Sequence, residues 1–418
     1  MPKRLLFVTT RLPFPPDSGR KVSLYHYCRG LSRDYGYEVD LFVFPEGDDR
    51  RDGAGKPDFI SDIYFAHPIR RRTKAMNLLF RSFLSPRRWP FQCALYYSAR
   101  NARAIASLCR EKQYDAVVFD MIRTAPYLSA VPGDCRRVLD MDDLLSRRYE
   151  RQLLSYDGKA GVAGRYGLQM RAGLEKHLCH GRAGKMILRG ECRRLRCAEP
   201  KMARLFDSVI LVSQAEADIL NEWLGEKRAV AVPMGVEARD FSPAMDAEKE
   251  ENLIGFVGNL GVSANLSALS VLTGETLPLL PKEVRLEVVG KCPPEVAERF
   301  RNEKRVLFRG MVPDLPPVAG RWQLTIAPFP YGSGLKTKVL EAMAMGLPVV
   351  TNPVGAEGIG APKNLLFVGE TPAQMAALAT RLLPDPAACR AAGLAGAAFV
   401  WKHFSWDGIF GAFAEAGL

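Results

Sequence analysis

Residues 331–350 read YGSGLKTKVLEAMAMGLPVV, a glycine-rich turn followed by a helical pattern. Gly332 and Gly334 can adopt backbone angles that are closed to other residues, so the amides of this turn can converge on an anion beside the positive end of the helix. Lys336 and Lys338 add formal charge in the first helical turn, where they oppose the helix dipole. Positive charges at the start of a helix lower its stability, so they tend to mark functional sites. We therefore favour a bound diphosphate over a solvated helix start.

The segments around this turn predict a strand, a helix and a second strand. LTIAPF (residues 324–329) precedes the turn and LPVVTN (347–352) follows the helix, which Gly346 and Pro348 bring to an end. The turn then lies at the carboxyl end of a strand, where open α/β sheets bind their ligands. Neither GxxxxGK[ST] nor GxGxxG is present, which removes the main support for a P-loop NTPase or a nicotinamide dehydrogenase.

Similar apolar runs recur along the whole chain. Ten runs rich in Val, Ile and Leu alternate with longer helical patterns, which indicates parallel sheets buried on both faces. At 418 residues the chain is too long for one ordinary core. We therefore predict an α/β protein of two Rossmann-like, doubly wound domains that join near residues 231–243, where Pro, Gly and polar residues interrupt the pattern. The ten runs are residues 4–10, 37–44, 114–120, 136–142, 206–213, 253–259, 285–291, 305–310, 324–329 and 347–352.

The composition predicts a soluble cytoplasmic protein. Apolar residues make up 47% of the chain and charged residues 25%, as in globular domains. No apolar run approaches the roughly 18 residues that span a bilayer, and proline interrupts the first apolar segment too early for a signal peptide. The nine cysteines are scattered without a CxxC pair, which favours reduced thiols over a disulfide framework.

The formal net charge of +12 is unevenly distributed. Residues 1–205 contain 39 lysines and arginines against 22 acidic residues, whereas residues 206–418 contain 19 against 24. Residues 64–112 carry eleven basic side chains and only Glu111 in opposition. This asymmetry indicates that the first half faces an anionic surface or substrate.

Residues 70–91, RRRTKAMNLLFRSFLSPRRWPF, are basic at both ends and apolar between. Met76, Leu79, Phe80 and Phe83 can form one face of a helix attracted to anionic lipid, which would make the protein peripheral on the inner membrane. A helix packed on the N-terminal sheet with a solvated basic side fits the same pattern. We expect no nucleic-acid partner, because no aromatic platform or recognition motif accompanies the charge.

Eight motifs follow one another along most of the chain: FPPDSGRKVSLYHYCRGLS (14–32), VILVSQAEADIL (209–220), VPMGVEARDFSP (232–243), FVGNLGVSANLSAL (256–269), VVGKCPPEV (288–296), FRGMVPDLPPV (308–318), GSGLKTKVLEAMAMGLPVVTNPVGAEGI (332–359) and FSWDGIFGAF (404–413). This ordered set resembles the GT-B glycosyltransferases of the retaining family 4 type. Together with DMDDLLSRRYERQ (140–152) and ECRRLRCAEPKMARLFDSV (191–209), the pattern most closely resembles the sugar transferases of bacterial exopolysaccharide clusters. The resemblance implies a GT-B fold of two Rossmann-like domains facing across a cleft. Residues 1–233 would form the acceptor-side domain, 234–400 the nucleotide-sugar domain, and 401–418 a helix packing back toward the N-terminal domain.

The resemblance also implies that a nucleotide-diphosphate sugar binds mainly to the C-terminal domain, with no metal or cofactor required. Glu341 would accept hydrogen bonds from the ribose hydroxyls, and Lys336 or Lys338 would hold the diphosphate. Fixed donors that stabilise the departing diphosphate lower the barrier to breaking the anomeric bond, so these three residues are the catalytic candidates. The implied donor-binding residues are Gly19, Gly258, Asn259, Gly290, Gly332, Ser333, Gly334, Leu335, Lys336, Lys338 and Glu341.

The sequence departs from the family in two places. Ser333 stands where many members have a glutamate against the donor sugar, and Asn259, Ser263 and Asn265 stand in the region where many have an arginine and a lysine. We predict a hexosyltransferase-like enzyme that moves a sugar to a hydroxyl of a glycan or lipid-linked glycan. The alternative is a non-catalytic GT-B subunit that binds sugar nucleotide or glycan, and Ser333 is its best support.

Two further groups carry candidate chemistry. Asp120 ends a predicted strand, where it can position an acceptor hydroxyl or act as a weak base, although a structural role fits equally well. Asp140, Asp142 and Asp143 follow another strand and precede a helical pattern, which helix capping usually explains; the alternative is a metal or acceptor-binding role. His177, Cys179 and His180 fit no closed zinc ligand set, and we expect no metal site.

Overall fold

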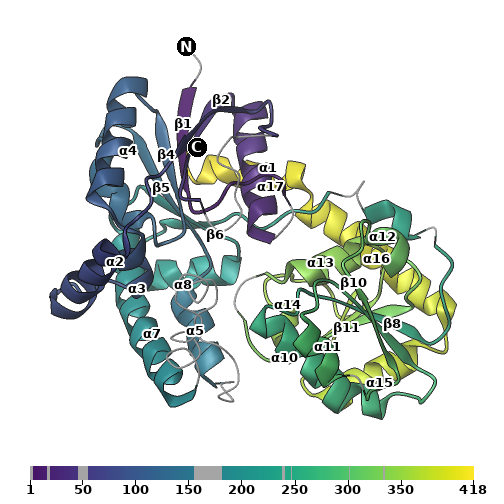
Figure 1. Ribbon diagram of the computed structural model, residues 1–418. Helices are drawn as coiled ribbons and strands as arrows, with labels where there is room; N and C mark the ends of the chain where they lie inside the picture. Colours follow the sequence, from purple (N-terminus) through teal and green to yellow (C-terminus); the bar gives the residue numbers. More distant parts are fainter. Residues whose placement is uncertain are drawn as a thin grey trace. The chain divides into compact units, whose positions relative to one another are not determined.

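The computed structural model describes residues 3–16, 19–45, 55–154, 181–237, 241–245, 247–300, 302–332 and 335–418. The chain divides into two compact units (Figure 1). The first unit comprises Met1–Arg147, Gly190–Met234 and Ile409–Leu418, and the second comprises Arg148–Arg189 and Gly235–Gly408. This division falls one residue from the predicted boundary after residue 233. Of the described residues, 148–154 and 181–189 group with the second unit rather than the first.

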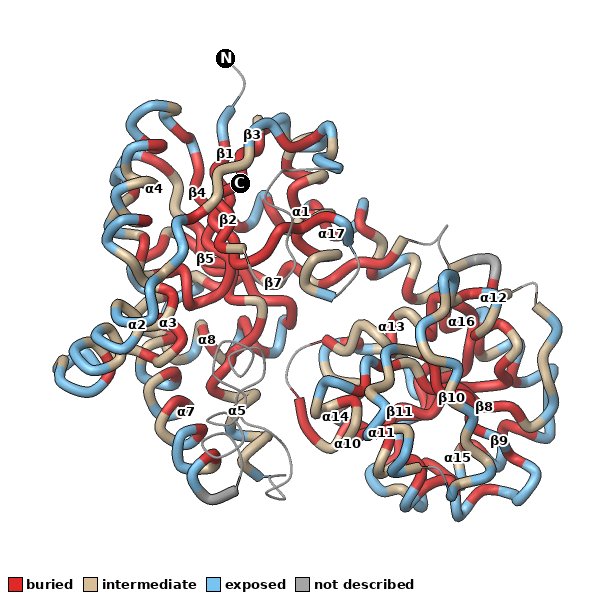
Figure 2. Tube along the Cα trace, viewed as in Figure 1, coloured by how far each residue is buried: buried red, intermediate tan, exposed pale blue. Residues whose placement is uncertain are grey.

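The first unit contains a seven-stranded parallel sheet in the order β3-β2-β1-β4-β5-β6-β7. Its central strands are buried almost throughout (Figure 2), because helices cover both faces. The strands are β1 (Lys3–Thr9), β2 (Tyr37–Val43), β3 (Ile60–Phe65), β4 (Ala116–Asp120), β5 (Arg136–Asp142), β6 (Ser208–Leu211) and β7 (Ala229–Ala231). Helical elements that lie wholly in this unit are α1 (Gly19–Arg33), α2 (Arg71–Asn77), η1 (Leu78–Leu84), α3 (Phe91–Tyr96), α4 (Ala99–Lys112), η2 (Ala125–Ala130) and α8 (Gln214–Leu224).

The second unit contains a six-stranded parallel sheet in the order β10-β9-β8-β11-β12-β13. The strands are β8 (Leu253–Val257), β9 (Arg285–Val289), β10 (Val306–Gly310), β11 (Leu324–Ala327), β12 (Val349–Thr351) and β13 (Leu366–Val368). The helical elements are η4 (Ser242–Met245), α10 (Ser263–Val271), η5 (Leu272–Thr276), η6 (Leu277–Leu279), α11 (Pro294–Arg299), α12 (Pro316–Ala319), α13 (Thr337–Ala344), α14 (Pro353–Ala356), α15 (Pro372–Leu382) and α16 (Pro386–Phe404).

Among the helices that the structure describes, three contribute residues to both units: α5 (Leu145–Leu154), α7 (Gly181–Ala203) and α17 (Trp406–Glu415). The end of α17 packs within the first unit, where the Tyr35 hydroxyl donates to the carbonyl of Phe410 and the Tyr27 ring meets Phe413 edge-on. Two buried carboxylates of α7 bind the first turns of other helices. Glu191 accepts hydrogen bonds from the amides of Phe91 and Gln92 in α3, and Glu199 accepts from the amide and hydroxyl of Ser146 in α5.

All ten predicted strands are present, which confirms the α/β prediction of two doubly wound sheets. The prediction missed β3, β7 and β13, which form outer edges of the two sheets. The physical reason differs between them. β3 is exposed or half-buried along most of its length and so lacks a continuous apolar run, whereas β7 and β13 are only three residues long.

The strand order reverses direction at one place in each sheet. In the first unit β1 pairs with both β2 and β4, and in the second unit β8 pairs with both β9 and β11. The loops after β1 and β4 therefore diverge to opposite sides, as do the loops after β8 and β11. Open α/β sheets bind ligands at the carboxyl ends of the strands beside such a switch point.

Candidate functional site

Most of the predicted donor-binding residues gather at the carboxyl edge of the sheet in the second unit. Gly258 and Asn259 follow β8, Gly290 follows β9, and Gly332 lies in the loop after β11. Leu335 and Lys336 lie just before α13, and Lys338 and Glu341 lie within it. Ser333 and Gly334 lie outside the described residues, as do Asp17 and Ser18 before Gly19. The site therefore straddles the switch point between β8 and β11.

The turns after β8 and β9 approach each other so closely that one position requires glycine. Gly290 has φ +133°, and a Cβ atom on it would lie 2.2 Å from the carbonyl oxygen of Gly258. Asn259 holds the next turn, because its side-chain oxygen accepts from the amide of Gly261 at 3.0 Å. Asn265 donates to the carbonyl oxygen of Asn259 at 2.9 Å. The two asparagines thus shape the loop, while the positive charge at this edge comes from elsewhere.

That charge comes from the start of α13. Lys336 occupies the N-cap position, and its Cε atom would lie 3.0 Å from a Cβ atom on Gly332, so its side chain lies against the glycine turn. Burial lowers the pKa of Lys338, and the nearby Glu341 carboxylate opposes this effect. Burial likewise raises the pKa of Glu341, and Lys338 opposes it. An anion bound beside Lys338 would favour its charged form.

A second polar cluster lies at the equivalent edge of the first unit. Arg20, whose side chain is only 6% exposed, reaches three aspartates at the ends of β4 and β5. Its guanidinium donates to Asp140 at 2.6 Å, to Asp120 at 2.8 and 3.0 Å and to Asp142 at 3.1 Å. These hydrogen bonds connect the first turn of α1 to the neighbouring strands β4 and β5, and so they fix the position of Gly19 at the start of α1.

The contacts of Asp120 argue against its predicted use as a base. Its carboxylate is fully buried and also accepts from the hydroxyl of Thr9 and from the amide and hydroxyl of Thr10. Although burial alone would raise it, the charges of Arg20 and Arg11 lower the pKa of Asp120 to about 2. A carboxylate this acidic is a poor proton acceptor near neutral pH. The structural role left open from the sequence is the one these contacts favour.

Asp140 has the opposite character in the same cluster. Burial, only partly offset by Arg20, raises its pKa to about 6. The sequence indicated these aspartates but not Arg20, although a signal was present. Arg20 directly follows Gly19, and as a cation in the first turn of a predicted helix it opposes the helix dipole, as Lys336 and Lys338 do.

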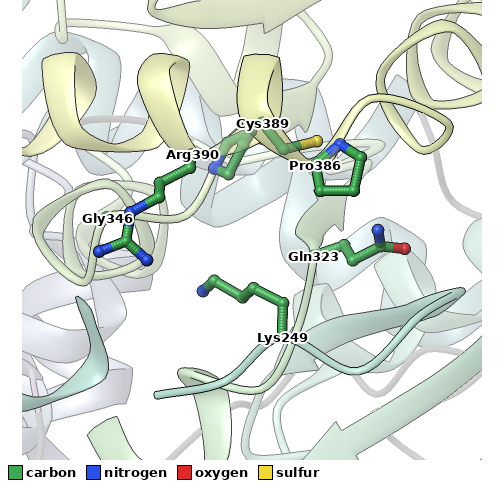
Figure 3. Close-up of a pocket in the computed structure, with 7 residues that line it drawn as sticks. Lys249, Gln323, Gly346, Pro386, Cys389 and Arg390 are labelled. Carbon is green, nitrogen blue, oxygen red and sulfur yellow. The ribbon is translucent and has the colours of Figure 1, made fainter. Parts of the chain in front are cut away.

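Other features lie away from these two clusters. A small cavity in the second unit is lined by residues that include Lys249, Gln323 and Cys389 (Figure 3), none of them a predicted site residue. Within the described residues, no group of three or more His, Cys, Asp or Glu is placed to hold a metal ion. His177, Cys179 and His180 lie outside that part of the chain. No helix in the described part is both long and apolar enough to cross a membrane.

Comparison with known proteins gives a family match over the sheet edge where Gly258, Gly290 and the start of α13 lie. Residues 251–385, which contain that edge, match the family described as glycosyl transferases group 1. No curated protein matches the chain. The family match and the two parallel sheets together support a glycosyltransferase of GT-B fold.

Solved structures match the chain over nearly its whole length. Sucrose-phosphate synthase from Thermosynechococcus elongatus has 16% identity and a TM-score of 0.69, with 99% of this chain and 98% of that chain covered. HepE of Anabaena in complex with UDP-glucose has 14% identity and a TM-score of 0.62, with coverage of 99% and 98%. A variant of S. aureus TarM in complex with UDP, fondaparinux and α-GlcNAc-glycerol has 10% identity and a TM-score of 0.65, with 99% of both chains covered. At these identities the likeness is one of fold, and it confirms the predicted GT-B architecture.

Proposed function

We propose that this protein is a retaining glycosyltransferase that moves a sugar from a nucleotide-diphosphate sugar to a hydroxyl of a glycan or lipid-linked glycan in polysaccharide biosynthesis. The observation that carries the proposal is the convergence of Gly258, Gly290, Lys336, Lys338 and Glu341 at one sheet edge, beside the β8/β11 switch point. Solved structures of the same fold contain UDP or UDP-glucose.

The residues of this edge suit a diphosphate leaving group. Lys336 and Lys338, with the amides at the start of α13, stabilise the negative charge that develops as the bond between the anomeric carbon and the phosphate oxygen breaks. The bonding electrons pass to the diphosphate, the acceptor oxygen bonds the anomeric carbon, and the acceptor proton leaves with the diphosphate. Glu341 accepts hydrogen bonds from the ribose. The lysines take the place of a metal, so no cofactor is needed.

Nucleotide binding tests the donor site directly. Titration calorimetry of the full chain with UDP, GDP, ADP, CDP and dTDP identifies the preferred base. With that nucleotide, Lys336→Ala and Lys338→Ala each weaken binding by about tenfold, the loss of one charge-assisted contact of about 1.5 kcal/mol. Lys282→Ala is the matched control, because Lys282 is an exposed lysine just before β9, at the opposite edge of the same sheet. Equal losses in the control and the site variants would contradict the proposal.

Turnover separates the enzyme from its alternative. Donor hydrolysis or transfer to a glycan acceptor, lost in Glu341→Gln and Lys338→Ala, supports the glycosyltransferase. Binding of a nucleotide sugar with no turnover under any acceptor supports the non-catalytic subunit instead. The anomeric configuration of the product, determined by proton NMR coupling, tests retention.

A further inference from the structure

An unusual concentration of exposed apolar side chains occurs where α2 continues into η1. We call these five residues the apolar tip: Met76, Leu79, Phe80, Phe83 and Leu84. Their side chains are 50% to 63% exposed, within a stretch of nine residues. Large apolar residues scattered singly over a surface need no explanation, but a contiguous group indicates a surface that meets another apolar phase.

The segment that carries the apolar tip is firmly attached to the first unit. Asn77 donates to the carbonyl oxygens of Ala94 and Tyr97 at 3.0 and 2.8 Å. The Arg81 guanidinium lies over the rings of Trp89 and Tyr97, with centroid distances of 4.6 and 4.2 Å. The Phe83 ring also meets the Phe91 ring at 5.5 Å and the Arg194 guanidinium at 5.3 Å, although it remains half exposed. These contacts fix the orientation of the segment while its apolar side chains stay exposed.

The apolar tip is flanked by cations on both sides. The basic flank consists of Arg70, Arg71 and Arg72 before it and Arg87 and Arg88 after it, all exposed. No acidic residue occurs between Asp62 and Glu111. The segment therefore combines exposed apolar side chains that can enter a lipid interface with exposed cations before and after them that attract anionic headgroups.

We propose that α2 and η1 form a docking surface for an anionic lipid bilayer, with the apolar tip inserted between headgroups and the basic flank in contact with them. Figure 1 shows α2 extending away from the sheet of the first unit, and Figure 2 shows this part of the chain as mostly exposed. A projecting apolar element suits insertion into lipid, whereas a protein partner or a second copy would need a matching groove. The inference does not depend on the sugar-transfer activity.

Sedimentation with lipid vesicles tests the surface in the intact protein. The full chain binds vesicles of phosphatidylcholine with phosphatidylglycerol and binds pure phosphatidylcholine vesicles far more weakly. Arg71→Glu combined with Arg72→Glu weakens binding by at least about 25-fold, from about fivefold per basic residue near the surface. Phe80→Ser combined with Phe83→Ser weakens it by about tenfold or more, because apolar insertion is lost.

Matched controls lie in the second unit. Leu279→Ser combined with Met311→Ser alters two comparably exposed apolar side chains, and Lys282→Glu combined with Lys304→Glu alters two exposed cations. Both control proteins keep wild-type binding. Circular dichroism and gel filtration of every variant confirm that the fold is retained.

A second readout locates the contact. Tryptophan fluorescence of Phe80→Trp gains quenching by brominated phosphatidylglycerol, whereas Met311→Trp does not. The proposal is overturned if the full chain fails to bind anionic vesicles, or if the apolar-tip variants bind as well as the controls. It is also overturned if light scattering shows a dimer that Phe80→Ser with Phe83→Ser dissociates while vesicle binding is unchanged, since a second copy would then cover the surface.

Discussion

Replacing Arg20 by alanine should leave three aspartates without their shared cation. The Arg20 side chain is 6% exposed, and those of Asp120 and Asp140 are fully buried. Alanine is at least as good a helix former as arginine, so the change does not disturb α1 through its intrinsic propensity. The effect should therefore come almost entirely from the buried charges.

The expected loss in the free energy of unfolding is large because two of the three partners, Asp120 and Asp140, cannot reach water. Removing one member of a buried ion pair typically costs about 3–5 kcal/mol, which is a substantial part of the 5–15 kcal/mol that stabilises an ordinary domain. The loss should shrink as pH falls from 8 to 5. Asp140 has a pKa of about 6 in the native protein, so at low pH it becomes neutral and no longer needs Arg20.

Urea unfolding followed by circular dichroism, at several pH values, measures this loss. Arg33→Ala is the control, because Arg33 lies on the same helix and its pair with Asp58 is 57% and 80% exposed. It should cost less than about 1 kcal/mol. Adding Asp140→Asn to Arg20→Ala should recover part of the stability. A loss for Arg20→Ala no greater than for Arg33→Ala, or one independent of pH, would refute the reasoning.

Two further predictions concern buried groups elsewhere. Burial raises the pKa of Glu191 to about 7 from 4.5, so its contribution to stability is complete below pH 4.5 and is lost as pH rises through 7. Glu191→Gln should therefore remove up to about 3 kcal/mol of the fall in unfolding free energy between these pH values. Parallel curves of unfolding free energy against pH for the variant and the wild type would contradict this prediction. Exposed Glu283→Gln is the control, measured by the same urea titrations. Gly255→Ala would place a Cβ atom 1.8 Å from the Trp322 ring in the core of the second unit and should lower the free energy of unfolding, measured in urea, by about 3 kcal/mol, the upper end of the usual cost of overpacking. A Cβ atom on Gly274 would meet nothing within 4 Å, so Gly274→Ala should change the free energy of unfolding little. Equal losses of unfolding free energy in the two variants would show that the contact with Trp322 does not limit the packing.

Local sequence determined the inner strands and located the residues predicted to bind the donor. A strand buried on both faces must be apolar along its whole length, so β1, β4, β8 and β11 could each be recognised within a few residues. The glycine turn and lysines around α13 are likewise contiguous in the chain. Their place at a sheet edge follows from one strand, one turn and one helix.

Tertiary structure alone decided the edge strands, the Arg20 cluster and the apolar tip. β7 and β13 are three residues long, and they form strands because they pair with the neighbouring strands β6 and β12. Arg20 is 100 to 122 residues from its aspartates, and only the order β1-β4-β5 brings them together. For α2 and η1 the sequence allowed either a packed or an exposed apolar face, because amphipathic periodicity gives the two sides of a helix but not which side meets the core. That choice depends on contacts such as those of Asn77 and Arg81 with α3 and the residues around it, which no local pattern encodes.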